Sequence, residues 1–89
     1  MADDFGARPH REHVVGAPFQ AGQAVRVVAA IDTEVHDVSE FVGACGTVAY
    51  LEYNCGCSQT YPEDPMIGVK FPDGRGEEFW SEELVARPD

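Results

Sequence analysis

The sequence has few basic residues. Its 6 lysines and arginines stand against 16 aspartates and glutamates, which gives a formal net charge of -10 at pH 7. Proteins that bind nucleic acids neutralise phosphate charge with lysine and arginine, and peripheral proteins contact anionic lipids through basic segments. A chain with this charge balance lacks the means for either. We therefore expect neither a nucleic acid nor a membrane surface as its partner.

Long apolar runs and a signal peptide are also missing. No stretch approaches the roughly 20 apolar residues of a membrane span, and the N-terminus lacks a basic region followed by an apolar one. Cysteine occurs three times, an odd number that does not suit the disulfide framework of a small secreted protein. We expect a cytoplasmic protein whose cysteines are reduced thiols or metal ligands. A length of 89 residues leaves room for one domain.

Familiar enzyme motifs are absent. The chain has no glycine-rich phosphate loop, no HExxH zinc motif, and no serine, histidine and aspartate in the order and context of a known hydrolase. No pairing of a base with a nucleophile, or of an acid with a base, is visible either. We therefore expect no catalytic activity from this chain on its own.

The pattern of apolar and polar residues in the rest of the sequence is mostly that of short β-strands. Alternation of apolar and polar residues, with many β-branched side chains, predicts five of them. The predicted strands are residues 24–30, 47–53, 66–71, 77–80 and 85–86. A single helical turn is expected within 31–42 and another at 81–84, the latter with Ser81 as its N-cap. The fold class is therefore all-β, as a small barrel or an open sandwich.

The domain is expected to begin at residue 19. Residues 1–18 contain two prolines, two glycines and mixed charge without periodicity, which is typical of a flexible or loosely packed tail. Residues 19–89 then form the folded domain. Its expected core consists of Val25, Val27, Val48, either Tyr50 or Leu51, Ile67, Val69, Phe71, Phe79, Trp80 and Leu84.

The order of glycines, valines and aromatics resembles a known group of barrels. The matching positions are Phe19, Gly22, Val25 and Val27, then Gly43, Gly46 and Val48, then Val69 and Phe71, and finally Phe79, Trp80, Glu83 and Leu84. Over residues 19–86 this resembles two SH3-like barrels, the C-terminal domain of the β-subunit in nitrile hydratase and the variable chain in ferredoxin–thioredoxin reductase. The resemblance implies a five-stranded SH3-like barrel that packs, without catalysing a reaction, against a metal-bearing partner.

Two departures from that group limit what can be transferred. The cysteine-rich motif that holds the metal in nitrile hydratase lies in its other subunit and is absent here. In addition, Cys45 stands where the group has a basic residue before the second glycine. No catalytic residue is therefore carried over from the resemblance.

Cys55 and Cys57 form the most chemically distinctive motif. Two thiolates separated by one glycine can reach the same zinc ion, and a structural zinc site needs two further ligands, for which Cys45 and His36 have suitable side chains. A straight strand between Cys45 and Cys55 would separate them by roughly 30 Å, so Cys45 is hard to bring to the same metal. Other candidate ligands are Glu63, Asp64, His10, His13 or a second chain.

The same two cysteines allow two other interpretations. They can be reduced thiols in a loop, or they can form a small strained disulfide that is redox-active rather than structural. The sequence leaves a structural zinc site, reduced thiols and a redox pair open.

A surface for a protein partner is expected near the only tryptophan. Phe79 and Trp80 are adjacent in a predicted strand and so face opposite sides, which leaves one of them at the surface. The residues expected to contact a partner are Trp80, Tyr61, Glu77, Glu78 and Glu82. Acidic side chains around an aromatic anchor favour a partner with a basic surface, and self-association of the chain is left open. The leading functional hypothesis is a non-catalytic accessory module that docks on a larger metalloprotein or redox protein.

Overall fold

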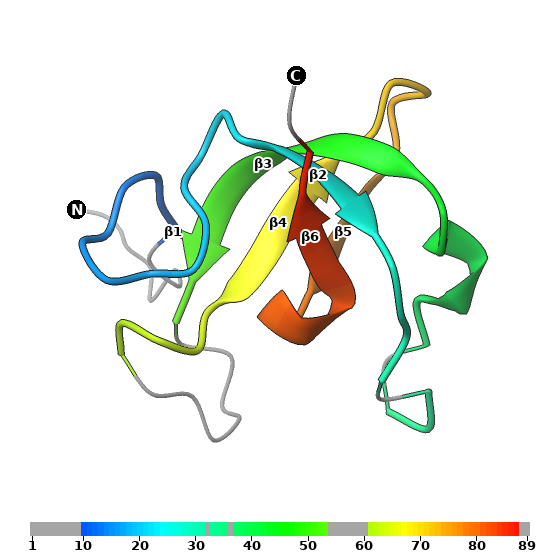
Figure 1. Cartoon of the computed structure of the whole chain (residues 1–89), viewed down its shortest axis with the longest axis horizontal. Helices are drawn as coiled ribbons and strands as arrows, with labels where there is room; N and C mark the ends of the chain where they lie inside the picture. The colour runs from blue at the N-terminus through cyan, green and yellow to red at the C-terminus, as the bar shows by residue number, and fades with distance from the viewer. Residues whose placement is uncertain (1–9, 32, 36, 54–60, 88–89) are drawn as a thin grey trace, which may run out of the picture.

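The computed structural model describes residues 10–31, 33–35, 37–53 and 61–87 (Figure 1). Its elements are β1 (His10–Arg11), β2 (Ala24–Val27), η1 (Ser39–Phe41), β3 (Cys45–Glu52), β4 (Met66–Lys70), β5 (Gly76–Phe79), η2 (Ser81–Glu83) and β6 (Leu84–Ala86). Within these residues the only helical elements are the two short 3-10 turns, so the all-β prediction is confirmed. No helix of the described part is long and apolar enough to cross a membrane.

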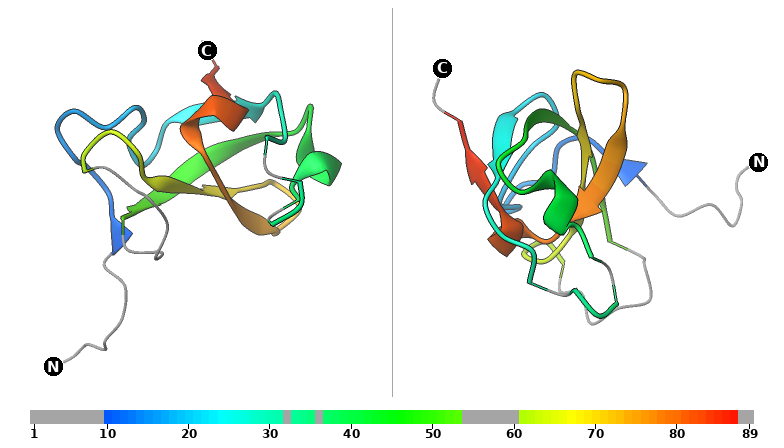
Figure 2. Two further views of the ribbon diagram at one scale, coloured as in Figure 1. Left: turned by 90° about the horizontal axis from the view of Figure 1, so that it is seen from below. Right: turned by 90° about the vertical axis from the view of Figure 1, so that its right-hand side faces the viewer.

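The strands form one antiparallel sheet in the order β5-β4-β3-β2-β6. β3 is the longest strand and lies at the centre, with β2 paired to its beginning, β4 along most of its length, and the short β1 at its end. Figure 2 shows how strongly the sheet curves, so that one face encloses the interior. Within the described residues, β6 is the last strand, and it pairs with β2.

The inner face of the sheet holds a core of valine and phenylalanine. Nine of the predicted core residues are buried, namely Val25, Val27, Val48, Leu51, Ile67, Val69, Phe71, Phe79 and Leu84. Four more residues join them, namely Val14, Phe19, Val38 and Phe41. The Phe41 ring stacks on Phe71 with centroids 4.9 Å apart and meets Phe79 edge-on at 5.8 Å. η1 therefore closes one end of the core through a single aromatic side chain.

A bulge in β3 decides which of its side chains face the core. The register with β4 shifts between Val48 and Tyr50, because Ala49 is an additional residue on the β3 side. Both Val48 and Leu51 are buried, although strict alternation would put them on opposite faces. The bulge turns the Tyr50 side chain outward and resolves the alternative between Tyr50 and Leu51 in favour of Leu51.

Residues 10–18, part of the segment expected to form a flexible or loosely packed tail, lie against the sheet. β1 pairs with the end of β3, and Val14 is only 4% exposed. The Gln20 side chain holds this segment in place, since its Oε1 accepts the Val14 N–H at 2.8 Å and its Nε2 donates to the Val14 carbonyl at 2.7 Å. One buried valine and one amide give no periodic signal, which is why the sequence pattern missed them. Residues 1–9 lie outside the described part.

A buried carboxylate joins η2 to the loop after β2. Glu83 is 1% exposed, and its Oε1 accepts the Trp80 N–H at 2.8 Å while its Oε2 accepts the Ile31 N–H at 2.9 Å. The prediction that Ser81 caps this turn is wrong, because Trp80 occupies the N-cap position and Glu83 satisfies its backbone donor. One side chain thus serves two backbone groups in distant parts of the sequence, and the hydrogen bond to Ile31 spans 52 residues.

Candidate functional site

The bulge in β3 and a glycine in β4 together create an outward-facing tyrosine. Tyr50 lies opposite Gly68 in the register. Its ring occupies the space that a Cβ atom on Gly68 would need. The ring therefore lies over β4 and reaches the next strand, where its hydroxyl donates to Glu78 Oε2 at 2.6 Å. A hydroxyl donor and an ionised acceptor at this distance form a charge-assisted hydrogen bond.

Tyr50 and Glu78 border a groove of about 540 Å³ on the outer surface of the sheet. Its wall and floor are formed by Ala49, Tyr50, Val69, Lys70, Gly76, Glu77 and Glu78. Both glutamates are half-buried, so their carboxylates are less screened by water than those on a fully exposed surface. We refer to this feature as the acidic groove. Its chemistry suits a cationic side chain that packs its apolar stem on the tyrosine ring.

Trp80 and Glu82 follow the acidic groove directly along the chain. Phe79, the last residue of β5, is fully buried, whereas Trp80 is half-buried at the start of η2 and lies outside the core in which it was also predicted. Its backbone position is held by Glu83, and Glu82 beside it is exposed. The segment from Glu77 to Glu82 thus presents three glutamates and a partly exposed indole on one continuous stretch of chain.

Tyr61 belongs to a different cluster. Among the described residues, its ring contacts are an edge-on approach to Tyr53, with centroids 4.7 Å apart, and the Arg11 guanidinium 5.5 Å from its centroid. The Tyr53 hydroxyl donates to the Pro62 carbonyl at 2.7 Å. Tyr61 itself is 55% exposed, so its outer face is available for contact. The sequence grouped Tyr61 with the acidic residues, but its position is set by Tyr53 and β1.

The Tyr53 phenol gives the protein an alkaline pH dependence. Burial, followed by the neighbouring Tyr61, raises the pKa of Tyr53 above its ordinary value of 10.0. A pKa raised by folding means that the folded state holds the proton more tightly, so stability falls as pH rises past 10.0. We expect chemical denaturation to show this alkaline loss of stability in the native chain and a smaller loss in Tyr53→Phe. Identical pH profiles for the two proteins would contradict this prediction.

Of the four predicted metal ligands, the structure describes only Cys45. Cys45 begins β3 and is half-buried on the outer face of the sheet. His36, Cys55 and Cys57 lie outside the described residues. In the part of the chain that the structure describes, no group of three or more histidine, cysteine, aspartate or glutamate residues could hold a metal. The zinc site and the redox pair at Cys55 and Cys57 therefore stay predictions.

Tyr50 is the site residue that sequence reasoning missed as a functional group. The sequence placed Tyr50 among the aromatics of the chain and as an alternative to Leu51 in the core, but not among the residues expected to contact a partner. A usable signal was the isolated Gly68 inside the apolar strand Met66–Lys70, because a glycine within a strand often marks the close approach of another group. Here the approaching group is the Tyr50 ring.

Comparison with known proteins identifies the fold family. The model of the family described as CarS bacterial SH3 domain matches residues 9–88. Neither a curated protein nor a solved structure matches the sequence. The match supports the SH3-like fold, whereas the closer likeness to the barrels of nitrile hydratase and ferredoxin–thioredoxin reductase stays a hypothesis. Because the match spans nearly the whole chain and begins before β1, this protein belongs to the CarS bacterial SH3 domain family.

Proposed function

We propose that this protein is a non-catalytic interaction module that binds a basic surface on a partner protein through its acidic groove. The observation that carries the proposal is the Tyr50–Glu78 hydrogen bond of 2.6 Å at the edge of a groove that Glu77 also lines. SH3 domains commonly bind protein partners and are generally non-catalytic, which agrees with this role.

The acidic groove and the residues after it have distinct parts in the proposed binding. Glu77, Glu78 and Glu82 attract and orient a basic partner during approach, since complementary charges mainly raise the association rate and set orientation. Tyr50 and Trp80 provide the apolar contact area. Tyr61 extends the contact if the partner is large enough to reach the neighbouring cluster. The hydrogen bond to Tyr50 fixes one carboxylate before the partner arrives, which reduces the ordering cost of binding.

The binding prediction uses a short peptide of alternating arginine and glycine as a defined basic probe. Amide chemical shifts are expected to change on β4 and β5 during titration, and the changes should shrink with added salt. The double variant Glu77→Gln and Glu78→Gln should weaken binding by roughly tenfold, because interfacial charge pairs commonly contribute a kcal/mol or more in total. The measurement is the dissociation constant from the shift titration.

A charge-matched control separates the groove from general acidity. Glu40 is an exposed acid of η1 that does not line the groove. The double variant Glu40→Gln and Glu12→Gln removes the same charge from exposed positions outside the groove. If this control weakens binding as much as the groove variant, or if binding is unaffected by salt, the acidic groove is not the docking site.

A further inference from the structure

Basic residues, although few, gather on one face of this acidic protein. Arg26, Lys70 and Arg87 line two neighbouring hollows on the outer surface of β2, β3, β4 and β6. Another cation, Arg75, lies outside both hollows and pairs with Asp73 in its own turn, with Nε and Oδ2 2.7 Å apart. Half of the 6 basic residues therefore lie on a single side of the sheet.

The strand register arranges two of these cations at the ends of one row. Lys70 in β4 lies opposite Thr47 in β3, and Thr47 lies opposite Ala24 in β2. Beyond Ala24, the Arg87 N–H donates to the Ala24 carbonyl at 2.8 Å. The row thus reads Lys70, Thr47, Ala24, Arg87 across four neighbouring chain segments. Three interstrand spacings separate the two cations, which corresponds to about 14 Å between their backbones.

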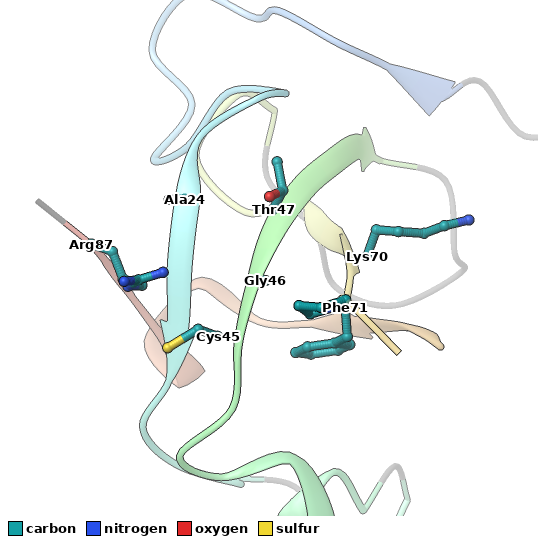
Figure 3. Close-up of a pocket in the computed structure, with 8 residues that line it drawn as sticks. Ala24, Cys45, Gly46, Thr47, Lys70, Phe71 and Arg87 are labelled. Atoms are coloured by element: carbon teal, nitrogen blue, oxygen red, sulfur yellow. The ribbon is translucent and has the colours of Figure 1, made fainter. Parts of the chain in front are cut away.

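Small side chains keep the middle of this row low. The hollow between the cations has a volume of about 420 Å³ and is lined by Ala24, Cys45, Gly46, Thr47, Phe71 and Pro72 in addition to Lys70 and Arg87. Figure 3 shows Lys70 and Arg87 on opposite sides of the β2 and β3 ribbons, with Ala24 and Thr47 between them. A ligand can therefore lie across the sheet between the two cations, over the small residues Ala24, Gly46 and Thr47. We call this feature the basic saddle.

We propose that the basic saddle binds an extended acidic peptide segment of a partner protein, with two carboxylates that pair with Lys70 and Arg87. In an extended chain, residues four apart are separated by about 13 Å and point to the same side. Two acidic residues at that spacing match the separation of the two cations. The intervening residues must be small, because the floor of the saddle is shallow.

The charge of the protein selects this occupant over a second copy of the chain. Each copy has a formal net charge of -10, so close approach of two copies is opposed by general repulsion. A short acidic segment carries only a few charges and meets the cations locally. The acidic groove lies on the other side of Lys70, which lines both features. The acidic peptide is therefore directed from Lys70 toward Arg87 and away from Glu77 and Glu78.

The test uses a capped pentapeptide with glutamate at its first and last positions and Ser-Gly-Ser between them. Titration at low salt should change the amide shifts of residues in the row, and the same peptide with glutamine at both ends should bind much more weakly. Lys70→Gln and Arg87→Gln should each raise the dissociation constant about two- to fivefold, as expected for exposed ion pairs. Arg75→Gln removes the same charge outside the saddle and should leave the constant unchanged.

The reactivity of the Cys45 thiol provides an independent measurement of peptide binding, because Cys45 lines the basic saddle. In a Cys55→Ser and Cys57→Ser variant, Cys45 is the remaining cysteine. A saturating concentration of the pentapeptide should slow the alkylation of Cys45 by the neutral reagent iodoacetamide. The proposal is overturned if the glutamine peptide protects Cys45 equally, or if Arg75→Gln weakens binding as much as Lys70→Gln. It is also overturned if the chain dimerises in sedimentation and Arg87→Gln abolishes the dimer, since the occupant would then be a second copy. None of these outcomes depends on whether the acidic groove binds a basic partner.

Discussion

Replacement of Glu83 by glutamine is expected to lower the free energy of unfolding by about 3 kcal/mol, which is the scale for disrupting a buried, charged hydrogen-bonding group. The Glu83 carboxylate accepts one backbone N–H through each of its oxygens, from Trp80 and from Ile31. A glutamine has one acceptor oxygen and one donor NH2 group, so one of these backbone donors would face another donor. Because Glu83 is 1% exposed, water cannot replace the lost acceptor without opening the turn.

Denaturant unfolding of the two proteins measures this effect. Glu82→Gln provides the matched control, because Glu82 is the exposed neighbour in the same turn and loses the same charge. It should change stability by less than about 0.5 kcal/mol. Equal stabilities for Glu83→Gln and the native chain would show that the two hydrogen bonds contribute little. Loss of stability in both variants alike would point to the charge of the turn rather than to its hydrogen bonds.

Gly46→Ala is expected to destabilise the protein by about 3 kcal/mol, at the upper end of the cost of overpacking a core. A Cβ atom at Gly46 would lie 2.7 Å from the Lys70 carbonyl oxygen and 2.7 Å from Val69 Cγ1. A backbone carbonyl within a paired strand cannot move aside without breaking the β3–β4 ladder, unlike the end of a flexible side chain. The added methyl group therefore forces the two central strands apart.

Gly76→Ala is the natural control for this substitution. Gly76 also lies in a strand, but a Cβ atom there would come no closer than 3.6 Å to the Val69 carbonyl oxygen, which is ordinary contact. Thermal unfolding should therefore show a large fall in midpoint for Gly46→Ala and almost none for Gly76→Ala. Similar midpoints for both variants would mean that β3 and β4 adjust to the extra atom more easily than their packing indicates.

The strands were predictable because each carries a local signal. Alternating valines and an Asp-Gly turn mark β2, β4 and β5, and all three occur within a few residues of their expected bounds. The order of the glycines and aromatics also led to the correct SH3-like fold. These features depend on residues close together in the sequence, so they can be predicted from the sequence alone.

The features that were missed depend on contacts between distant residues. Val14 is buried only because β1 folds back on the end of β3, and no periodicity in residues 1–18 reports that pairing. Likewise, the sequence alone does not distinguish Glu83 from the surface acids near it, because its hydrogen-bond partner Ile31 is 52 residues away. The outward turn of Tyr50 required a bulge at Ala49, which alternation alone hides. The candidate site was therefore predicted as two aromatics and three glutamates, without Tyr50, whose hydroxyl donates to Glu78.

The strand order also has a consequence for how this chain folds as it is made. β2 lies early in the sequence, but one of its two neighbours in the sheet is β6. Their pairing Val27↔Leu84 joins residues from nearly opposite ends of the domain. The Ile31–Glu83 hydrogen bond spans a similar stretch. Contacts of such long sequence separation form late, because a large loop must close first. A growing polypeptide on the ribosome thus keeps one edge of β2 open until residues Leu84–Ala86 of β6 have emerged.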